Sequence, residues 1–245
     1  MFLKQIQELL AVSGGSLPTL ILRPDRPSGP TIIVLGEIWA VNPQIRGLCE
    51  RLAEEGFPVV APDLYRGQDI PAPDATPAAL SEAFVSFPDL RALRDCRTLV
   101  RRIVGGEFGL SPERPAVWGF CMGGRFAHYL GAFNTGVARV VNFYGRLNFP
   151  RSELKPFTPL DVASLIDVPY LGIFAEHDGF IPKTDVAALV GKLRETGIEH
   201  DVRMFEGVHH GFLNETREAY DESAASTAWE ITLRFLRANQ GGSAT

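Results

Sequence analysis

A cysteine between glycines is the residue of this sequence best placed to do chemistry. Gly119, Cys121 and Gly123 form the pattern Gly-x-Cys-x-Gly, in which a nucleophile is expected on a sharp turn between a strand and a helix. The apolar segment 115–118 favours a strand, and the segment 125–130 can continue as a helix. Because a thiol ionises more readily than a hydroxyl and is the stronger nucleophile, the pattern indicates nucleophilic catalysis.

Such a nucleophile needs a base, and the base needs an acid that orients it. Asp178 and His210 follow it in the chain, in the order nucleophile, acid, histidine that accompanies this kind of turn. Each lies a few residues past a predicted strand, at the strand end where ligands bind in open α/β sheets. Asp178 and His210 are therefore predicted to form a catalytic triad with Cys121.

Several of these residues also have a plainer explanation. A lone cysteine is commonly a small buried apolar residue, which is the expectation for Cys49 and Cys96 inside predicted helices. Asp178 is also placed to cap the helix that follows it. His209 is the alternative base, and His210 is favoured over it because only His210 is followed by Gly-Phe.

Glu37 follows a predicted buried strand at 31–35. The loop after that strand ordinarily supplies one backbone N–H of an oxyanion hole, and the residue after the nucleophile supplies the other. The expected donors are the N–H groups of Ile38 and Met122, which would stabilise charge on a carbonyl oxygen. A carboxylate beside such a site is costly without a partner, so Glu37 either has one or is a solvated loop charge.

The elements that must position these residues alternate between strand-like and helix-like segments, which favours a mostly parallel sheet covered by helices. Strands are expected at 31–35, 58–61, 115–118, 138–144, 170–175 and 201–205. Helices are expected at about 43–55, 90–104, 185–195 and 217–238, besides the helix after the cysteine. We expect a long loop at 63–77, a lid or insertion at 146–167 and a frayed end at 241–245.

Taken together, six segments resemble the dienelactone hydrolase family, also called carboxymethylenebutenolidases, within the α/β-hydrolases. The segments are Gly36-Glu37-Ile38-Trp39 with Val41-Asn42 and Ile45-Arg46; Ala61-Pro62-Asp63-Leu64-Tyr65; Gly119-Phe120-Cys121-Met122-Gly123-Gly124; Phe143-Tyr144-Gly145; His177-Asp178; and His210-Gly211-Phe212.

The resemblance implies an α/β-hydrolase fold with a mostly parallel central sheet flanked by helices on both faces. It implies a Cys121-His210-Asp178 triad that opens lactones or activated esters through a thioester acyl-enzyme. It also implies that Glu37 accepts a hydrogen bond from the resting thiol until substrate displaces it. No metal or organic cofactor is expected.

The sequence departs from the family where members hold a substrate carboxylate with two arginines. Asn214 stands four residues after His210, where one arginine is expected, and the segment 76–87 that should supply the other contains none. A substrate without a carboxylate is therefore expected. Arg125, Arg146 and Arg217 are the conceivable replacements.

Candidate pocket residues follow from the same segments. They are Trp39, Tyr65, Tyr144 and Asn214, although the three aromatic residues fit a plain core role equally well. The sequence leaves open an esterase or thioesterase of other substrate preference on the same triad. From another class, it leaves open a non-catalytic sensor in which Cys121 is modified without turnover.

Composition excludes several other functions. The 245 residues suffice for one hydrolase domain over 1–245, as a monomer or small homo-oligomer. With 24 basic and 29 acidic residues, no affinity for nucleic acid or anionic membranes is expected. No apolar run reaches the roughly 18 residues of a membrane span. Three scattered cysteines and no secretory pattern predict a cytoplasmic protein without a metal site. A small lactone or ester as the substrate is what the family resemblance implies.

Overall fold

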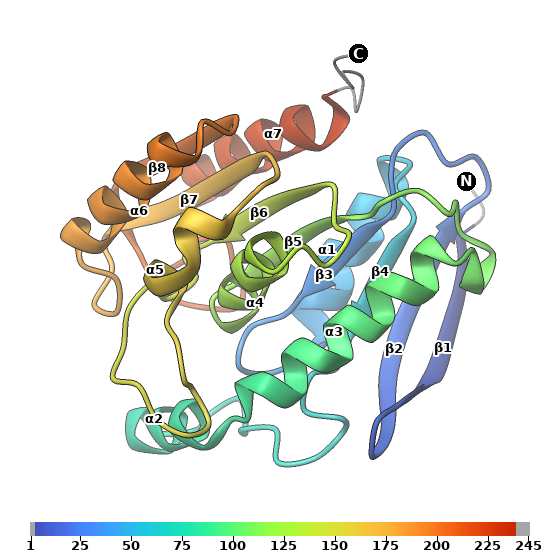
Figure 1. Cartoon of the computed structure of the whole chain (residues 1–245), viewed down its shortest axis with the longest axis horizontal. Coiled ribbons are helices and arrows are strands. Elements are labelled where there is room, and N and C mark those ends of the chain that lie inside the picture. The colour runs from blue at the N-terminus through green and yellow to red at the C-terminus, as the bar shows by residue number, and fades with distance from the viewer. Residues whose placement is uncertain (1–2, 239–245) are drawn as a thin grey trace.

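One sheet of eight strands forms the middle of the molecule, which is described here by a computed structural model covering residues 3–238 (Figure 1). The strand order is β1-β2-β4-β3-β5-β6-β7-β8. From β4 to β8 the neighbouring strands are parallel, whereas β2 is antiparallel to both β1 and β4. The predicted mostly parallel α/β architecture is therefore confirmed.

The bounds of the elements are as follows. The strands are β1 (Leu3–Val12), β2 (Gly15–Pro24), β3 (Ile32–Leu35), β4 (Val59–Pro62), β5 (Ala116–Phe120), β6 (Arg139–Phe143), β7 (Tyr170–His177) and β8 (His200–His209). The helices are α1 (Pro43–Glu54), α2 (Pro77–Ser86), α3 (Asp89–Val104), α4 (Met122–Ala132), α5 (Pro159–Val162), α6 (Lys183–Thr196) and α7 (Glu222–Arg237), with 3-10 turns η1 (Glu107–Gly109) and η2 (Ala163–Leu165).

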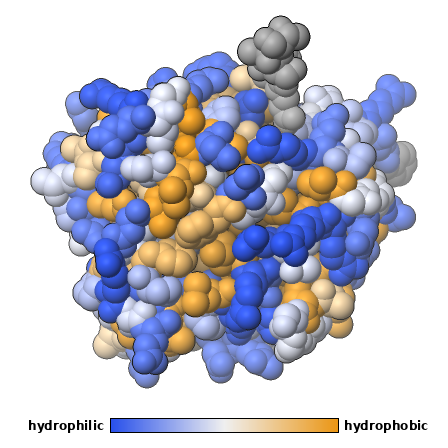
Figure 2. Space-filling view, in the orientation of Figure 1, coloured by the Kyte–Doolittle hydropathy of each residue, from blue (hydrophilic) through white to orange (hydrophobic). Residues whose placement is uncertain are grey.

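Helices cover the sheet in two groups. In one group, helix α4 contacts α3, α5 and the central strands (Figure 1). In the other group, α1 and α7 contact each other, and the Arg51 guanidinium lies 4.2 Å from the centroid of the Trp229 ring. Every residue of β3, β4, β5 and β6 is buried, which suits central parallel strands covered on both faces. Figure 2 shows the outer surface of one face, which is mostly hydrophilic with hydrophobic residues gathered near its middle. Among the described helices, none has the length and apolarity needed to cross a bilayer.

The hairpin β1–β2 and helix α2 are among the elements that the sequence pattern does not predict. The hairpin escapes prediction because β1 lies at the sheet edge and most of its side chains are exposed, which hides the alternation of a strand. Helix α2 was missed because it buries no residue, although the Thr76 side chain caps it by accepting from the Ala79 N–H at 3.2 Å.

Other boundaries moved for identifiable reasons. Helix α7 begins at Glu222 rather than at 217, because the Asp221 carboxylate accepts from the Ala224 N–H at 2.8 Å and so fixes the first turn. Strand β8 continues to His209, which leaves His210 as the first residue beyond the strand. The expected lid or insertion at 146–167 contains α5 and η2. The expected frayed end at 241–245 lies outside the described residues.

Candidate active site

Cys121 occupies a strained turn between β5 and α4. Its backbone has φ 51° and ψ −108°, outside the regions that residues with a side chain ordinarily adopt. The chain is packed tightly on both sides of it. A Cβ at Gly119 would lie 2.0 Å from the Gly123 carbonyl oxygen, and a Cβ at Gly123 would lie 2.0 Å from the Leu35 oxygen. A side chain at either position would collide with backbone atoms, so only glycine fits there.

Alanine at Gly123 is expected to lower the free energy of unfolding by about 1–3 kcal/mol, since the obstructing atoms are backbone and cannot turn away. Gly191 in α6 is the matched control, because nothing lies within 4 Å of the Cβ that alanine would add there. Gly191→Ala should raise the free energy of unfolding by roughly 0.5–1 kcal/mol. Urea denaturation of both variants tests this, and equal effects would contradict the packing described for the elbow.

Asp178 and His210 form an acid–base pair at the ends of β7 and β8. The Asp178 Oδ2 atom lies 2.6 Å from His210 Nδ1, and its Oδ1 accepts from the Phe180 N–H at 2.8 Å. The carboxylate is almost wholly buried, with 1% of the side chain exposed. Both oxygens of Asp178 therefore have partners, and the imidazole is fixed through Nδ1.

The far side of the imidazole is directed to the cysteine. Burial lowers the pKa of His210, but the charge of Cys121 and the hydrogen bond that His210 donates to Asp178 outweigh burial and raise this pKa to about 10. Within the described part of the chain, His210 Nε2 is buried without a hydrogen bond of ordinary geometry. A histidine in this setting can hold a proton taken from the thiol.

Two backbone N–H groups beside the cysteine have no acceptor within residues 3–238: those of Ile38 and Met122. Met122 begins α4, so its N–H has no partner within the helix. The Gly123 N–H donates to the Gly36 oxygen at 3.0 Å and so ties the loop of Ile38 to the start of α4. Both groups can therefore serve an oxyanion.

Glu37 is buried and has protein partners. Its Oε2 accepts from Asn214 Nδ2 at 2.9 Å, and the Tyr144 hydroxyl also hydrogen-bonds the carboxyl group. Burial raises the pKa of Glu37, against the lowering effects of His210, Asn214, Arg217 and Tyr144. No hydrogen bond joins Glu37 to Cys121 among the described residues, so the thiol here interacts with the histidine.

The turn that presents Tyr144 is held from within the core. Tyr144 has φ 39°, and the next N–H, of Gly145, donates to Asn142 Oδ1 at 2.9 Å. The Asn142 amide in turn donates to the Tyr170 hydroxyl at 2.8 Å. The Tyr144 ring thereby stands edge-on to His210, with centroids 5.1 Å apart. Tyr144 thus contacts both Glu37 and the histidine.

The remaining predicted pocket residues lie at different depths. Trp39 is half-buried and donates to the Ala72 oxygen at 3.2 Å. Tyr65 is buried, with its hydroxyl 3.9 Å from the Met122 sulfur. Asn214 is buried at Glu37, so it acts on the carboxylate and does not form an exposed wall.

The three arginines considered as replacements fall in separate places. Arg125 is fully buried, pairs with Asp89 at 3.1 Å, and lies 4.7 Å from the ring of Phe84 in α2. Arg146 lies 5.0 Å from the same ring. Arg217 lies 4.5 Å from the Trp39 ring and is the one of the three whose charge lowers the pKa of Glu37.

Phe180 is a site residue that the sequence reasoning missed. Besides binding Asp178 through its N–H, it places its ring 5.2 Å from that of His210. The signal was Asp178-Gly179-Phe180, since an aspartate commonly accepts a hydrogen bond from the N–H two residues later in a turn.

Cys49 and Cys96 are buried in α1 and α3, and burial raises the pKa of both thiols. No group of His, Cys, Asp and Glu within residues 3–238 is arranged to hold a metal ion.

The sequence model of the dienelactone hydrolase family matches residues 17–240. The chain belongs to this family. A protein of Escherichia coli K12 that bears the provisional name carboxymethylenebutenolidase is 30% identical over 227 residues, covering 91% of this chain and 83% of that protein. Protein usf of Aquifex pyrophilus is 32% identical over 223 residues, covering 85% and 88%.

Solved structures agree with the fold. A Klebsiella pneumoniae crystal structure, described provisionally as a dienelactone hydrolase, superposes with a TM-score of 0.89 at 28% identity, over 98% of this chain and 100% of that one. The dienelactone hydrolase-like promiscuous phosphotriesterase P91 from metagenomic libraries has a TM-score of 0.77 at 18% identity, over 96% and 97%, and shows the fold alone. This dienelactone hydrolase family member is therefore a hydrolase of lactone or ester bonds.

Proposed function

We propose that the protein is a cysteine-dependent hydrolase that opens a lactone or activated ester through a thioester on Cys121. The observation that carries the proposal is the strained turn that presents Cys121 to the buried Asp178–His210 pair. A nucleophile, a base and an orienting acid in contact are the parts that acyl transfer requires.

In the acylation step, the Cys121 sulfur attacks the carbonyl carbon while His210 Nε2 holds the thiol proton. Asp178 keeps the imidazole in the tautomer with Nδ1 protonated and stabilises its charged form. The N–H groups of Ile38 and Met122 bind the carbonyl oxygen as it gains negative charge. Collapse of this intermediate breaks the ester C–O bond, and the leaving alkoxide takes the proton from His210.

In the deacylation step, His210 takes a proton from water, whose oxygen attacks the thioester carbonyl. The C–S bond then breaks, the carboxylic acid leaves, and the proton returns to the thiol–imidazole pair. For a lactone the leaving alkoxide stays attached to the acyl group, so one hydroxy acid is released. Tyr144 stands edge-on to His210, and we propose that Glu37 acts on the thiol when Asn214 or Tyr144 releases it.

One equivalent of iodoacetamide is expected to alkylate Cys121 alone and abolish hydrolysis of an activated ester. Cys49 and Cys96 are fully buried, so the native protein offers one accessible thiol. Peptide mapping locates the label, and an ester assay on the same sample measures the activity. Full activity in a sample whose Cys121 is quantitatively alkylated would refute the proposal.

Labelling together with ester assays also distinguishes the proposed function from a thiol sensor and from an esterase or thioesterase. A thiol sensor would be modified once without turnover, and it would have no use for the acid and base that the cysteine faces here. An esterase or thioesterase of other preference would show higher kcat/KM for linear substrates than for lactones. Residence in the cytoplasm and a monomer or small homo-oligomer stay predictions.

A further inference from the structure

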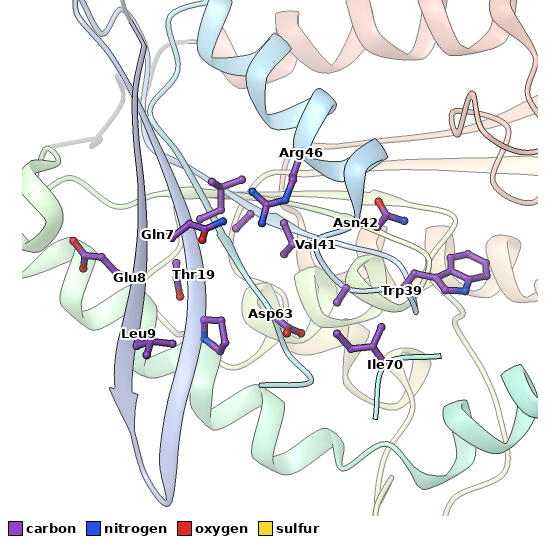
Figure 3. Close-up of a pocket in the computed structure, with 14 residues that line it drawn as sticks. Gln7, Glu8, Leu9, Thr19, Trp39, Val41, Asn42, Arg46, Asp63 and Ile70 are labelled. Atoms are coloured by element: carbon purple, nitrogen blue, oxygen red, sulfur yellow. The ribbon is translucent and has the colours of Figure 1, made fainter. Parts of the chain in front are cut away.

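A second pocket lies between the hairpin β1–β2, the start of α1 and the loop 36–42 (Figure 3). It encloses about 530 Å³, within the range of small-molecule sites. Glu37, Cys121, Asp178 and His210 do not line it. The proposed mechanism therefore leaves this pocket without a role.

Much of the lining of the pocket is apolar. Leu20 and Ala61 are buried and form part of the wall, and Trp39 borders it from the loop. Leu9 and Ile70 belong to the rim although they are 73% and 41% exposed. Large apolar side chains left in water around a hollow favour a ligand with an apolar body.

The pocket also contains a cation, Arg46, that forms no ion pair within residues 3–238. Arg46 is the fourth residue of α1. Its partner is the Gln7 amide, whose oxygen, when turned to the guanidinium, accepts at 3.0 and 3.3 Å. A neutral amide satisfies hydrogen bonds without cancelling the charge.

Two acids, Glu8 and Asp63, also line the pocket, but neither forms an ion pair with Arg46. The Asp63 carboxylate is hydrogen-bonded to its own turn, because its oxygens accept from the Tyr65 N–H at 2.9 Å and the Gly67 N–H at 2.7 Å. Glu8 follows Gln7 in β1, so its side chain points to the opposite face, and Figure 3 shows it turned away from Arg46. A ligand with a negative charge at the Arg46 end is therefore favoured.

We infer that this pocket binds a small carboxylic acid with an apolar tail. The carboxylate sits on the Arg46 guanidinium, the positively charged group of the lining. The tail lies toward Trp39 and Ile70. Ester hydrolysis releases carboxylic acids, so the ligand belongs to the class of the enzyme's products and lies against the loop that carries Ile38.

Titration calorimetry with octanoate tests the inference on the full chain after alkylation of Cys121, which blocks the active site. Octanoate should still bind, and its uncharged analogue octanamide should bind about tenfold more weakly or worse, as a lost charged hydrogen bond implies. Arg46→Gln should weaken octanoate binding to a similar degree, whereas Arg46→Lys keeps most of it. Arg97→Gln, at an exposed arginine of α3, is the matched control and should bind as the unchanged protein does.

Four results would overturn the inference. They are equal affinity for octanoate and octanamide, an unchanged affinity in Arg46→Gln, loss of binding on alkylation of Cys121, and no binding up to about 10 mM. None of these readouts requires turnover. Failure of this inference is therefore distinguishable from failure of the thioester mechanism.

Discussion

Replacing Cys121 with alanine is expected to lower kcat/KM for an activated ester by about 10⁴-fold or more. The sulfur is the atom that forms the acyl bond, and the neighbouring N–H donors and histidine cannot substitute for it. Alanine has nearly the volume of cysteine, so the turn at φ 51° should survive. Circular dichroism and a thermal melt check the fold, and stopped-flow release of the alcohol measures the rate.

Two matched variants show whether the effect belongs to this sulfur. Cys96→Ala removes a buried thiol from α3 and should leave kcat/KM unchanged. Cys121→Ser keeps an attacking oxygen but a weaker nucleophile, so its rate should lie between those of the unchanged protein and Cys121→Ala. If Cys121→Ala hydrolyses the ester at an undiminished rate, the cysteine is not the nucleophile.

Asp178→Asn is expected to lower kcat by about 10⁴-fold while leaving KM nearly unchanged. The asparagine amide can present its NH2 group to His210 Nδ1 and so stabilise the wrong tautomer, with Nε2 carrying the proton. It also removes one of the two charges that raise the pKa of His210 to about 10. A loss smaller than about tenfold would show that Asp178 only caps the following turn.

Asp178→Asn should also change how the free energy of unfolding depends on pH. Because the pKa of His210 is raised in the folded state, its charged form contributes stability that is fully present below about pH 6.5 and is lost as the pH rises through about 10. The gap in unfolding free energy between the unchanged protein and Asp178→Asn should therefore be largest at low pH within this window. Urea denaturation at its two ends tests this, and a gap that widens toward pH 10 would contradict it.

The sequence predicted the central strands and the elbow because both follow strong local rules. β3, β4 and β5 are short apolar runs, and Gly119 with Gly123 marks the only kind of residue that fits beside the nucleophile. The chain order of Cys121, Asp178 and His210 placed all three at strand ends, and the fold brings the last two to 2.6 Å. Their catalytic roles stay proposals until the variants are measured.

What the sequence did not predict depends on tertiary contact. β1 pairs at the edge of the sheet. Helix α2 buries no residue of its own, although its Phe84 ring lies over Arg125. Neither segment therefore shows the spacing of apolar residues that predicts a strand or a helix. The partnership of Asn214 with Glu37 joins residues far apart in the chain. The hydrogen bond also gives Asn214 a role that its departure from the family pattern did not suggest, as a partner of the buried carboxylate.

The most direct test of the account is to detect the acyl group on the sulfur. The protein is mixed with an activated ester, quenched in acid within milliseconds, and analysed by intact mass and peptide mapping. We predict a mass increase equal to the acyl group, located on the peptide of Cys121, released by hydroxylamine, and absent from Cys121→Ala. Turnover with no acyl group on Cys121 under conditions where alcohol release shows a burst would contradict the proposed thioester mechanism.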